Sequence, residues 1–346
     1  MSSEKKLIVP HALFPSKPGP KAVDMKDEKK LVVAHAPFWH DGSKISTKNY
    51  HIMLAALPAV LMGISQYGAP AVGVIALATA CAMIWELIMN LAMRRQISIG
   101  DGSAAVTGLL LGMLMPATAP WWVVVLGTFL AIIVGKQIFG GIGFNPLNPP
   151  LLALAMLVMS FKGVFDFDEA LLNYDLGFAM SYPLGQVKYF GTAAIDKFSL
   201  GDLFMGKQAG GIGSTFGLGL IVGGLYLILR GYIRWEISLS FLAGVFVTAL
   251  LFNLSDPTKY ASPVFHLLTG YTLIAAFFLV PEDSSSPVNF IPMLIFGALA
   301  GLMTVLIRNI GAYVDGIPFS ILLMNLANPL LDKIRPKAIG KVVENA

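Results

Sequence analysis

Ten apolar stretches, four of them shorter than a usual membrane span, constrain this chain more than any other feature. A bilayer-spanning helix needs roughly 17–25 mostly apolar residues, because each residue rises about 1.5 Å through a core about 30 Å thick. The stretches do not alternate apolar and polar residues as barrel strands do. We therefore predict an all-α polytopic membrane protein with about ten transmembrane helices. The stretches lie near 50–67, 70–93, 103–116, 121–135, 149–162, 213–229, 237–253, 264–281, 290–307 and 317–331.

Composition supports this class of protein. Apolar residues make up 56% of the chain and charged residues only 13%, against roughly 45–50% and 25% in soluble domains. These values exclude a disordered chain, a nucleic-acid-binding domain and most cytosolic enzymes. The single cysteine, Cys81, lies inside an apolar stretch, so this chain alone builds no disulfide, cysteine zinc site or iron–sulfur cluster.

The distribution of cationic residues predicts the orientation. Residues 1–48 contain nine lysines and no long apolar core, which is typical of a cytoplasmic leader and not of a signal peptide. Ten spans then return the 333–346 tail to the same side, and 18 of the 24 Lys and Arg residues fall on that side, as the positive-inside rule requires. We expect a multi-pass protein of the cell inner membrane with both termini cytoplasmic. His35, His40 and Asp41 in the leader lack metal-site spacing, and we predict no metal site.

An internal repeat divides the membrane region into two halves, 49–162 and 213–332. The segment 145–152 (NPLNPPLL) returns in outline as 325–331 (NLANPLL), and Thr107-Gly108 has a weaker echo in Thr269-Gly270. Five stretches precede the acidic 163–212 loop and five follow it, so the halves run in opposite directions. We predict a 5+5 inverted repeat with short or broken helices that meet near the midplane. The outer 163–212 loop is either functional, as loops of this length often are, or a solvated linker.

Four asparagines belong to the repeated element: Asn145, Asn148, Asn325 and Asn328. The prolines beside them remove backbone donors and break helices, and backbone groups freed in hydrocarbon need new partners. Asparagine amides supply both donors and acceptors. The four side chains therefore either cap broken helices or line a polar path or cofactor pocket.

Ionisable residues inside the apolar stretches are candidates for an ion path. Glu86 lies well inside the second stretch, where a carboxylate is costly and a functional candidate. The alternative is a pairing with Arg94 at the interface. Asp101 opens the third stretch and is our second ion-path candidate. We expect an interfacial His266, and little cost for the charges at stretch ends, namely Lys136, Asp283, Arg308 and Asp315.

Three long motifs now resemble a known family. They are 101–111 (DGSAAVTGLLL), 135–149 (GKQIFGGIGFNPLNP) and 321–330 (ILLMNLANPL). Together they resemble the RnfD subunit of the Rnf electron-transport complex and the related NqrB subunit of the sodium-pumping NADH:quinone oxidoreductase, over about residues 34–340. The resemblance implies a membrane subunit of a complex that moves electrons between ferredoxin and NAD while translocating Na⁺ or H⁺. Such a subunit is not catalytic alone, and its partners are other membrane subunits and peripheral flavin and iron–sulfur subunits.

The resemblance also implies a flavin. Family members carry FMN, joined through its phosphate to a threonine in a Ser-Gly-Ala-Thr-Pro-Leu-like motif on the outer loop. Aligned on 200–203 (LGDL), the threonine position is occupied by Phe198, which has no hydroxyl to esterify. Thr192 and Ser199 are nearby hydroxyls outside the motif. We therefore expect no covalent FMN at Phe198, and a flavin that is either bound noncovalently or absent.

Two other functions fit the same sequence. A self-contained secondary transporter or channel for a small solute also suits an inverted repeat with broken helices. A flavin-free scaffold and ion-path subunit of the same complex is the third hypothesis. Copurifying partners and a yellow, flavin-containing preparation distinguish the first function from these two.

Overall fold

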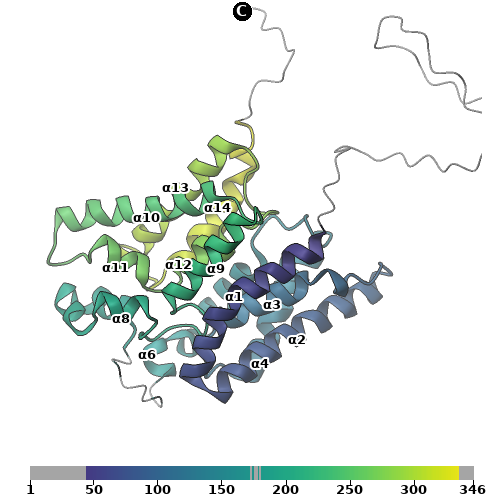
Figure 1. The fold of residues 1–346 in the computed structure, drawn as a ribbon, viewed down its shortest axis with the longest axis horizontal. Helices are drawn as coiled ribbons and strands as arrows, with labels where there is room; N and C mark the ends of the chain where they lie inside the picture. The colour runs from purple at the N-terminus through teal and green to yellow at the C-terminus, as the bar shows by residue number, and fades with distance from the viewer. Residues whose placement is uncertain (1–43, 172–173, 175–177, 179–180, 335–346) are drawn as a thin grey trace, which may run out of the picture. The chain divides into compact units, whose positions relative to one another are not determined.

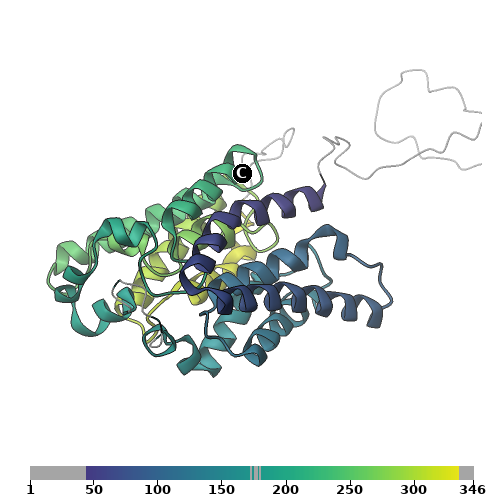
Figure 2. The ribbon, with the colours of Figure 1, turned by 60° about the horizontal axis from the view of Figure 1, so that its bottom comes forward.

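The computed structural model describes residues 44–171, 174, 178 and 181–334, and all regular secondary structure in this part of the chain is helical. The leader residues His35, His40 and Asp41 and most of the 333–346 tail lie outside the described residues. Two groups of helices, one from each end of the described chain, lie next to each other in both views (Figures 1 and 2).

The first group covers residues 45–160, which we call the first half. Gly102, at φ 73°, lets the chain turn directly into the third apolar helix. Asn148 caps the last helix of this half, since its side chain accepts a hydrogen bond from the Leu151 N–H. The helices are α1 (Ile45–Tyr67), α2 (Ala69–Ala92), η1 (Ile99–Asp101), α3 (Ser103–Leu114), α4 (Trp121–Phe129), η2 (Leu130–Gln137) and α5 (Pro149–Ser160).

The second half covers residues 217–331. Its third element is interrupted near Gly270, where φ is 66°, so the apolar stretch 264–281 forms three short pieces instead of one helix. The helices are α9 (Gly217–Leu229), α10 (Trp235–Ser255), α11 (Pro263–Leu268), α12 (Thr272–Ile274), η5 (Ala275–Leu279), α13 (Phe290–Asn309) and α14 (Ile317–Leu331).

Every apolar stretch seen in the sequence contains helix, as predicted. Four of these helices, α1, α2, α10 and α13, are long and apolar enough to cross a bilayer, and five shorter apolar helices accompany them in the described part of the chain. Large apolar side chains such as Leu61, Ile84, Leu251 and Leu254 lie exposed on the long helices. Apolar exposure on this scale is typical of a lipid-facing surface, so the chain is a polytopic membrane protein.

The helices approach one another closely where glycine faces backbone. A Cβ atom at Gly223 of α9 would overlap the Ala55 carbonyl oxygen of α1. A Cβ atom at Gly244 of α10 would likewise overlap the Ala298 carbonyl oxygen of α13. Lipid tails are as apolar as leucine, so close backbone packing of this kind is what drives helix association in membranes.

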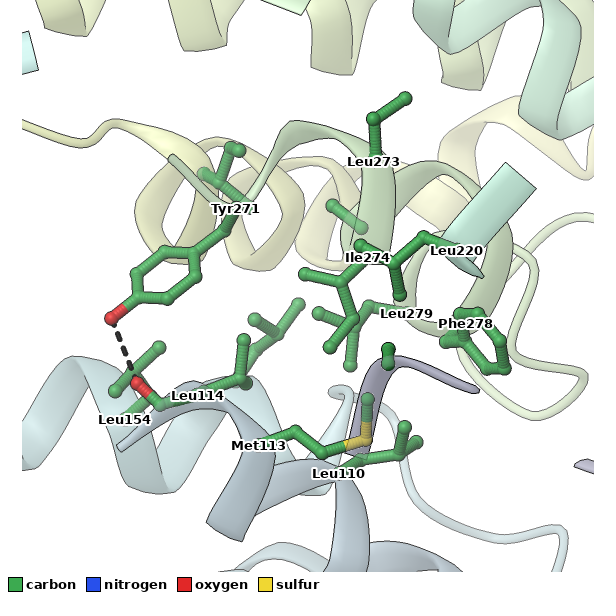
Figure 3. Packing of buried hydrophobic residues seen from close by; sticks show 14 of the residues in the cluster. Leu110, Met113, Leu114, Leu154, Leu220, Tyr271, Leu273, Ile274, Phe278 and Leu279 are labelled. Carbon is green, nitrogen blue, oxygen red and sulfur yellow. Dashed lines mark hydrogen bonds between the residues drawn. The ribbon is translucent and has the colours of Figure 1, made fainter. Parts of the chain in front are cut away.

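The two halves share one apolar core. α3 of the first half packs against α9, α12 and η5 of the second through buried leucine, isoleucine and phenylalanine side chains (Figure 3). The Tyr271 hydroxyl donates to the Leu114 carbonyl oxygen at 2.9 Å and satisfies the end of α3 (Figure 3). The halves are therefore held together by burial and by a hydrogen bond to a helix terminus.

One expected helix break is absent. The proline of the first repeated element, Pro149, begins α5 after an irregular segment, but Pro329 lies inside α14. Proline deprives the residue four positions earlier, Asn325, of its hydrogen bond. Because α14 ends at Leu331, the cost is confined to the final turn, and the helix continues through the proline.

The connecting segments gather at two ends of the described unit. End A comprises the turns 93–102, 138–148, 230–234 and 280–289, and contacts such as Arg95 Nη1 to the Gly140 carbonyl (2.9 Å) join them. End B comprises 115–120, the described residues of 161–216, 256–262 and 310–316, joined for example by Ile212 N to the Met115 carbonyl (3.0 Å). α1 begins at end A and ends at end B, and its 23 residues span about 34 Å.

The loop 163–212 carries short helices at end B. They are η3 (Lys162–Phe165), α6 (Phe167–Ala170), α7 (Pro183–Phe190), η4 (Thr192–Lys197) and α8 (Leu200–Phe204). Aromatic side chains anchor the loop: Phe167 packs on Tyr182 and Tyr271, with ring centroids 5.0 and 6.3 Å apart. The loop is thus packed onto the membrane helices and is more than a linker.

Candidate functional site

A cavity of about 250 Å³ lies at end A, between the two halves. α1, α3, η2 and the 142–150 segment line it from the first half. The end of α9, η5 and the 281–284 turn line it from the second half. We call it the end A cavity, and its polar lining consists of Lys48, Asn49, Ser103, Thr107, Lys136, Asn145, Asn148, Glu282, Asp283 and Ser284.

The repeated asparagines meet beside this cavity. The hydrogen-bond network assigns the Asn325 amide so that its oxygen accepts from the Asn148 N–H at 2.9 Å and its nitrogen donates to the Ser285 carbonyl at 3.3 Å. Asn328 Nδ2 donates to the same Ser285 carbonyl at 3.3 Å. Two elements that are 180 positions apart in the sequence are therefore directly hydrogen-bonded.

The first pair of asparagines also reaches into the second half. Asn148 Nδ2 donates to the Leu279 carbonyl oxygen at 2.9 Å, and Asn145 Nδ2 donates to Glu282 Oε1 at 2.9 Å. Leu279 is the last residue of η5, so Asn148 satisfies the carbonyl end of that helix. Both amides are thus committed to protein partners, and they clamp the two halves together.

Glu282 also lines the end A cavity, and it was not identified from the sequence as a candidate site residue. Burial raises the pKa of its carboxyl group, although hydrogen bonds from Ser285 and Asn145 act in the opposite direction. The neighbouring Asp283, which forms an ion pair with Lys48, raises that pKa further. Glu282 follows Pro281 at the end of an apolar stretch, and a carboxylate there is usually solvated.

A buried ion pair lies beside the same cavity. Lys136 Nζ is 2.9 Å from Glu86 Oε1, and the two side chains are 4% and 1% exposed. Lys136 also donates to Ser103 Oγ at 2.5 Å. Glu86 Oε1 accepts further hydrogen bonds from Gln137 and Ser98, at 3.1 and 3.2 Å. Glu86 therefore pairs with Lys136 and not, as one alternative held, with Arg94.

The expectation that charges at stretch ends cost little was wrong at three positions. Lys136, Arg308 and Asp315 are buried, because helix ends in this protein are covered by other segments of the chain. His266 is likewise buried, at 2% exposure. A one-dimensional hydropathy window cannot show which helix ends are covered.

Asp101 has a structural contact at end A. Its carboxylate accepts from the Ser103 N–H at 2.7 Å, at the start of α3, and its carbonyl accepts from Asn49 Nδ2 at 2.7 Å. Ser103 and Asn49 line the end A cavity, whereas Asp101 does not. Both ion-path candidates therefore form hydrogen bonds with residues that line the end A cavity: Glu86 with Lys136, and Asp101 with Ser103 and Asn49.

The candidate residues of the loop do not come together with the asparagines. Thr192 Oγ1 donates to the Thr258 carbonyl at 2.5 Å, and Ser199 caps α8 by accepting from the Asp202 N–H at 3.1 Å. Phe198 is a buried member of the apolar core, 7% exposed. These three residues lie at end B, and their side chains serve the packing of the loop.

A larger cavity at end B was missed in the sequence. It measures about 370 Å³, and we call it the aromatic cavity because seven rings line it: Phe165, Phe167, Tyr182, Tyr189, Tyr271, Tyr313 and Phe319. Lys162 and three aspartates, Asp166, Asp168 and Asp315, supply its charged lining. The signal in the sequence was the frequency of aromatic residues in the 163–212 loop.

The flavin motif can also be aligned at this cavity. The only Pro-Leu pair of the 163–212 loop is Pro183-Leu184, and Ser181-Tyr182 precedes it. Tyr182 then occupies the threonine position. Its side chain is buried, and burial raises the pKa of its phenol well above the usual value, as does the nearby Asp315. With either alignment, at Phe198 or at Tyr182, the position holds no threonine.

A second buried ion pair lies at end B. Arg308 Nε and Nη2 are 3.2 and 3.0 Å from Asp315 Oδ1, and the two side chains are 2% and 8% exposed. Arg308 also donates to the His266 carbonyl and to Thr272 Oγ1, both at 2.9 Å. Asp315 Oδ2 accepts from the Tyr271 N–H at 2.9 Å.

These features define a helical membrane protein with buried ion pairs at both ends and a polar cavity between its halves. The chain belongs to the NQR2, RnfD, RnfE family, whose model matches residues 32–340. Similar proteins are named as the D subunit of an ion-translocating oxidoreductase complex. The one from Pectobacterium atrosepticum is 33% identical over 343 residues, and the one from Cronobacter sakazakii is 34% identical over 342. Each match covers 88% of this chain and 97% of the relative.

Proposed function

We propose that this chain is a membrane subunit of an Rnf-type ferredoxin:NAD oxidoreductase complex and contributes to electron transfer coupled to Na⁺ or H⁺ translocation. The observation that carries this proposal is the convergence at end A. Lys136, Asn145 and Asn148 line one cavity between the halves, and Glu86 and Asn325 contact these lining residues from behind. Intramembrane carboxylates paired with cations are typical of ion pathways.

The ion path that we propose begins at the end A cavity. Lys136 lines this cavity, and its ammonium pairs with Glu86, which lies directly behind the cavity wall. Glu86 Oε2 is buried without a hydrogen-bond partner among the described residues. A carboxylate oxygen with free lone pairs is a ligand for a hard cation such as Na⁺ or an acceptor for a proton.

Paired contacts support the 5+5 inverted repeat, 49–162 against 213–332. Lys136 lies in the last turn of η2, which ends the fourth apolar stretch of the first half. It donates to Ser103, the first residue of α3 in the third stretch. Arg308 lies in the last turn of α13, which forms the fourth apolar stretch of the second half. It donates to Thr272, the first residue of α12 in the third stretch. The first contact lies at end A and the second at end B, as two halves of opposite direction require.

The proposed orientation places end A, and with it both termini, on the cytoplasmic side of the inner membrane. The turns of end A carry Arg94, Arg95, Arg230 and Arg234. Contacts join predicted inner segments to inner ones and outer segments to outer ones, for example Lys48 to Asp283 and Lys188 to the Gly311 carbonyl. The positive-inside rule then selects the side.

For the flavin, we propose noncovalent binding in the aromatic cavity. The asparagine amides fit a cofactor poorly, because Asn145 and Asn148 already have protein partners and the end A cavity is small. The aromatic cavity is within the usual size range of ligand pockets. Its rings, among them Tyr182, Tyr271 and Phe319, offer faces for stacking against the planar ring system of a flavin. Its three aspartates and single lysine suit that ring system and not a phosphate. A bound flavin supplies one- and two-electron transfer, for which side chains of this kind are unsuited.

Purification of the tagged full-length chain from its native membranes tests the proposal. We expect flavin and iron–sulfur subunits to copurify, and acid precipitation to release the chain's flavin into the supernatant. Flavin that stays on a peptide covering 181–207 contradicts noncovalent binding. If the chain in the complex contains no flavin, the cofactor proposal is overturned, and the chain is then a flavin-free scaffold and ion-path subunit. A lone, colourless oligomer that conducts a solute overturns the proposed function in favour of a transporter.

A further inference from the structure

A third cavity, of about 240 Å³, lies at end B and has a cationic lining. Lys188 of α7, Lys259 and Arg308 all contribute to its wall, and no carboxylate is among the described residues that line it. We call it the cationic cavity. It lies between the 184–191 segment, the turn before α11 and the end of α13, and it is distinct from the end A cavity.

Two polar side chains at this cavity have unused hydrogen-bonding groups. His266 is 2% exposed, and within the described part of the chain neither of its ring nitrogens has a hydrogen-bond partner. The amide nitrogen of Asn309 is also buried without a partner there. A neutral imidazole offers one donor and one acceptor, and an amide nitrogen offers two donors. Buried polar groups of this kind are nearly always satisfied, so a ligand or solvent group is required.

The charges around the cavity are only partly compensated. Asp315 neutralises Arg308 from outside the cavity, and Lys188 Nζ donates to the Gly311 and Tyr313 carbonyls at 2.6 and 2.5 Å. Those carbonyls leave the Lys188 charge unneutralised, and burial lowers the pKa of its ammonium group. The Lys259 ammonium lies 5.2 Å from the centre of the Tyr260 ring, at the exposed edge, and interacts with the Asp256 carboxylate, which does not line the cavity. Two positive charges therefore face the cavity without a carboxylate on its wall.

We propose that the cationic cavity binds the phosphate group of a ligand. Phosphate oxygens accept hydrogen bonds from Lys188, Lys259 and Asn309, and charge-assisted bonds of this type are the strong ones. A protonated phosphate oxygen also donates to the acceptor nitrogen of His266, so hydrogen phosphate uses both ring nitrogens. The site adjoins the aromatic cavity, with which it shares Tyr189 and Val314, but its phosphate binding does not depend on the proposed function.

Two sources supply a phosphate group, soluble phosphate and the headgroup of an anionic lipid; in phosphatidylglycerol a glycerol hydroxyl replaces the protonated phosphate oxygen as donor to His266. The test uses the full-length chain within its complex, in nanodiscs of phosphatidylcholine or of phosphatidylcholine with phosphatidylglycerol. Inorganic phosphate is titrated into the first preparation, and binding is followed by calorimetry. Native mass spectrometry counts the phosphatidylglycerol retained by the second.

The variants are Lys259→Gln at the exposed edge and His266→Phe at the buried wall. We expect Lys259→Gln to weaken phosphate binding about tenfold, the loss of one charge-assisted hydrogen bond. Lys207→Gln is the matched control, because Lys207 is an exposed end B lysine that pairs with Asp202 and does not line the cavity. Should His266→Phe fail to fold, Lys259→Gln alone still decides the outcome.

Phosphate binding that Lys259→Gln weakens and Lys207→Gln leaves unchanged supports the site with soluble phosphate as its source. Retention of phosphatidylglycerol with the same variant pattern supports the site with a lipid headgroup as its source. Absence of both kinds of binding overturns the proposal. Equal effects of the two lysine variants overturn it as well, because they show general charge attraction and no defined site.

Discussion

The two buried ion pairs of this protein lie at opposite ends and are built differently. At end B, Arg308 contacts Asp315, two backbone carbonyls and Thr272. At end A, the Lys136 ammonium forms hydrogen bonds only with Glu86 and Ser103 among the described residues. The planar guanidinium holds several partners in fixed directions, whereas the lysine ammonium is a compact charge on a flexible chain.

The residues that surround the two ion pairs also differ. Lys136 lines the end A cavity beside Glu282, whose pKa is raised by burial. Arg308 spans the interruption between α11 and α12 and holds the free carbonyls of His266 and Thr269. The comparison indicates that Arg308 fixes the fold of a broken helix, whereas the Lys136 ammonium has fewer partners, as our proposal of an ion path at end A requires.

The largest effect that we expect is on stability at end B. Arg308→Met leaves Asp315 buried and uncompensated, and breaking a buried pair in this way costs about 3–5 kcal/mol. Thermal unfolding in detergent measures the loss. Arg308→Lys is the control, because lysine keeps the positive charge but lacks the forked guanidinium. Its unfolding midpoint should lie between those of Arg308→Met and the native protein. An unchanged midpoint in Arg308→Met would remove the structural role of this pair.

At end A we expect a smaller cost. Glu86→Gln leaves Lys136 without its carboxylate but keeps an amide oxygen as hydrogen-bond acceptor, so the loss should lie at the lower end for broken buried pairs, about 3 kcal/mol. Adding Lys136→Met to Glu86→Gln should restore most of the unfolding midpoint. A double-mutant cycle on the unfolding midpoints measures the coupling. Additive effects of the two substitutions would show that the pair is not coupled.

The pH dependence of stability sharpens the role of Glu282. Its folded-state pKa is raised above the ordinary value of 4.5 by burial, so its contribution to stability is complete below that value. The contribution is lost as the pH rises through the raised pKa. Glu282→Gln keeps the hydrogen bond from Asn145 and should be the more stable form at pH 7–8, with a flatter profile. Unfolding midpoints at pH 4–8 test this, and parallel profiles for the two proteins would contradict it.

The smallest effect belongs to an exposed pair. Lys207 and Asp202 are 54% and 49% exposed, and exposed ion pairs contribute little. We expect Lys207→Gln to leave the unfolding midpoint unchanged within error in the same melting experiment. A shift comparable to that of Glu86→Gln would mean that burial is not what distinguishes these pairs.

Much of the fold could be predicted from the sequence because hydrophobic length alone identifies membrane helices. Each of the ten stretches contains helix, and the repeat of Asn145–Asn148 with Asn325–Asn328 indicated segments that the structure brings into direct contact. Glu86 was also correctly located as a carboxylate inside a long apolar helix. These features depend on local composition, which a sequence displays.

The sequence could not show which charges at helix ends are covered. Lys136 and Arg308 follow apolar stretches in the same way as exposed cations do, and only tertiary packing distinguishes them. Glu282 and the aromatic cavity were missed for the same reason. The interruption at Gly270 was not located either, although Thr269, Gly270 and Thr272 make this part of the stretch 264–281 less apolar.

The Glu86→Gln/Lys136→Met double variant gives the most direct test of the account. Its folded complex is placed in inverted membrane vesicles, and ion uptake is measured per NAD reduced with ferredoxin as donor. We predict that NAD reduction continues while uptake of Na⁺ or H⁺ falls at least about tenfold, the effect of removing a functional intramembrane charge pair. Uptake equal to that of the native complex would contradict the account and remove the end A cavity from the ion path.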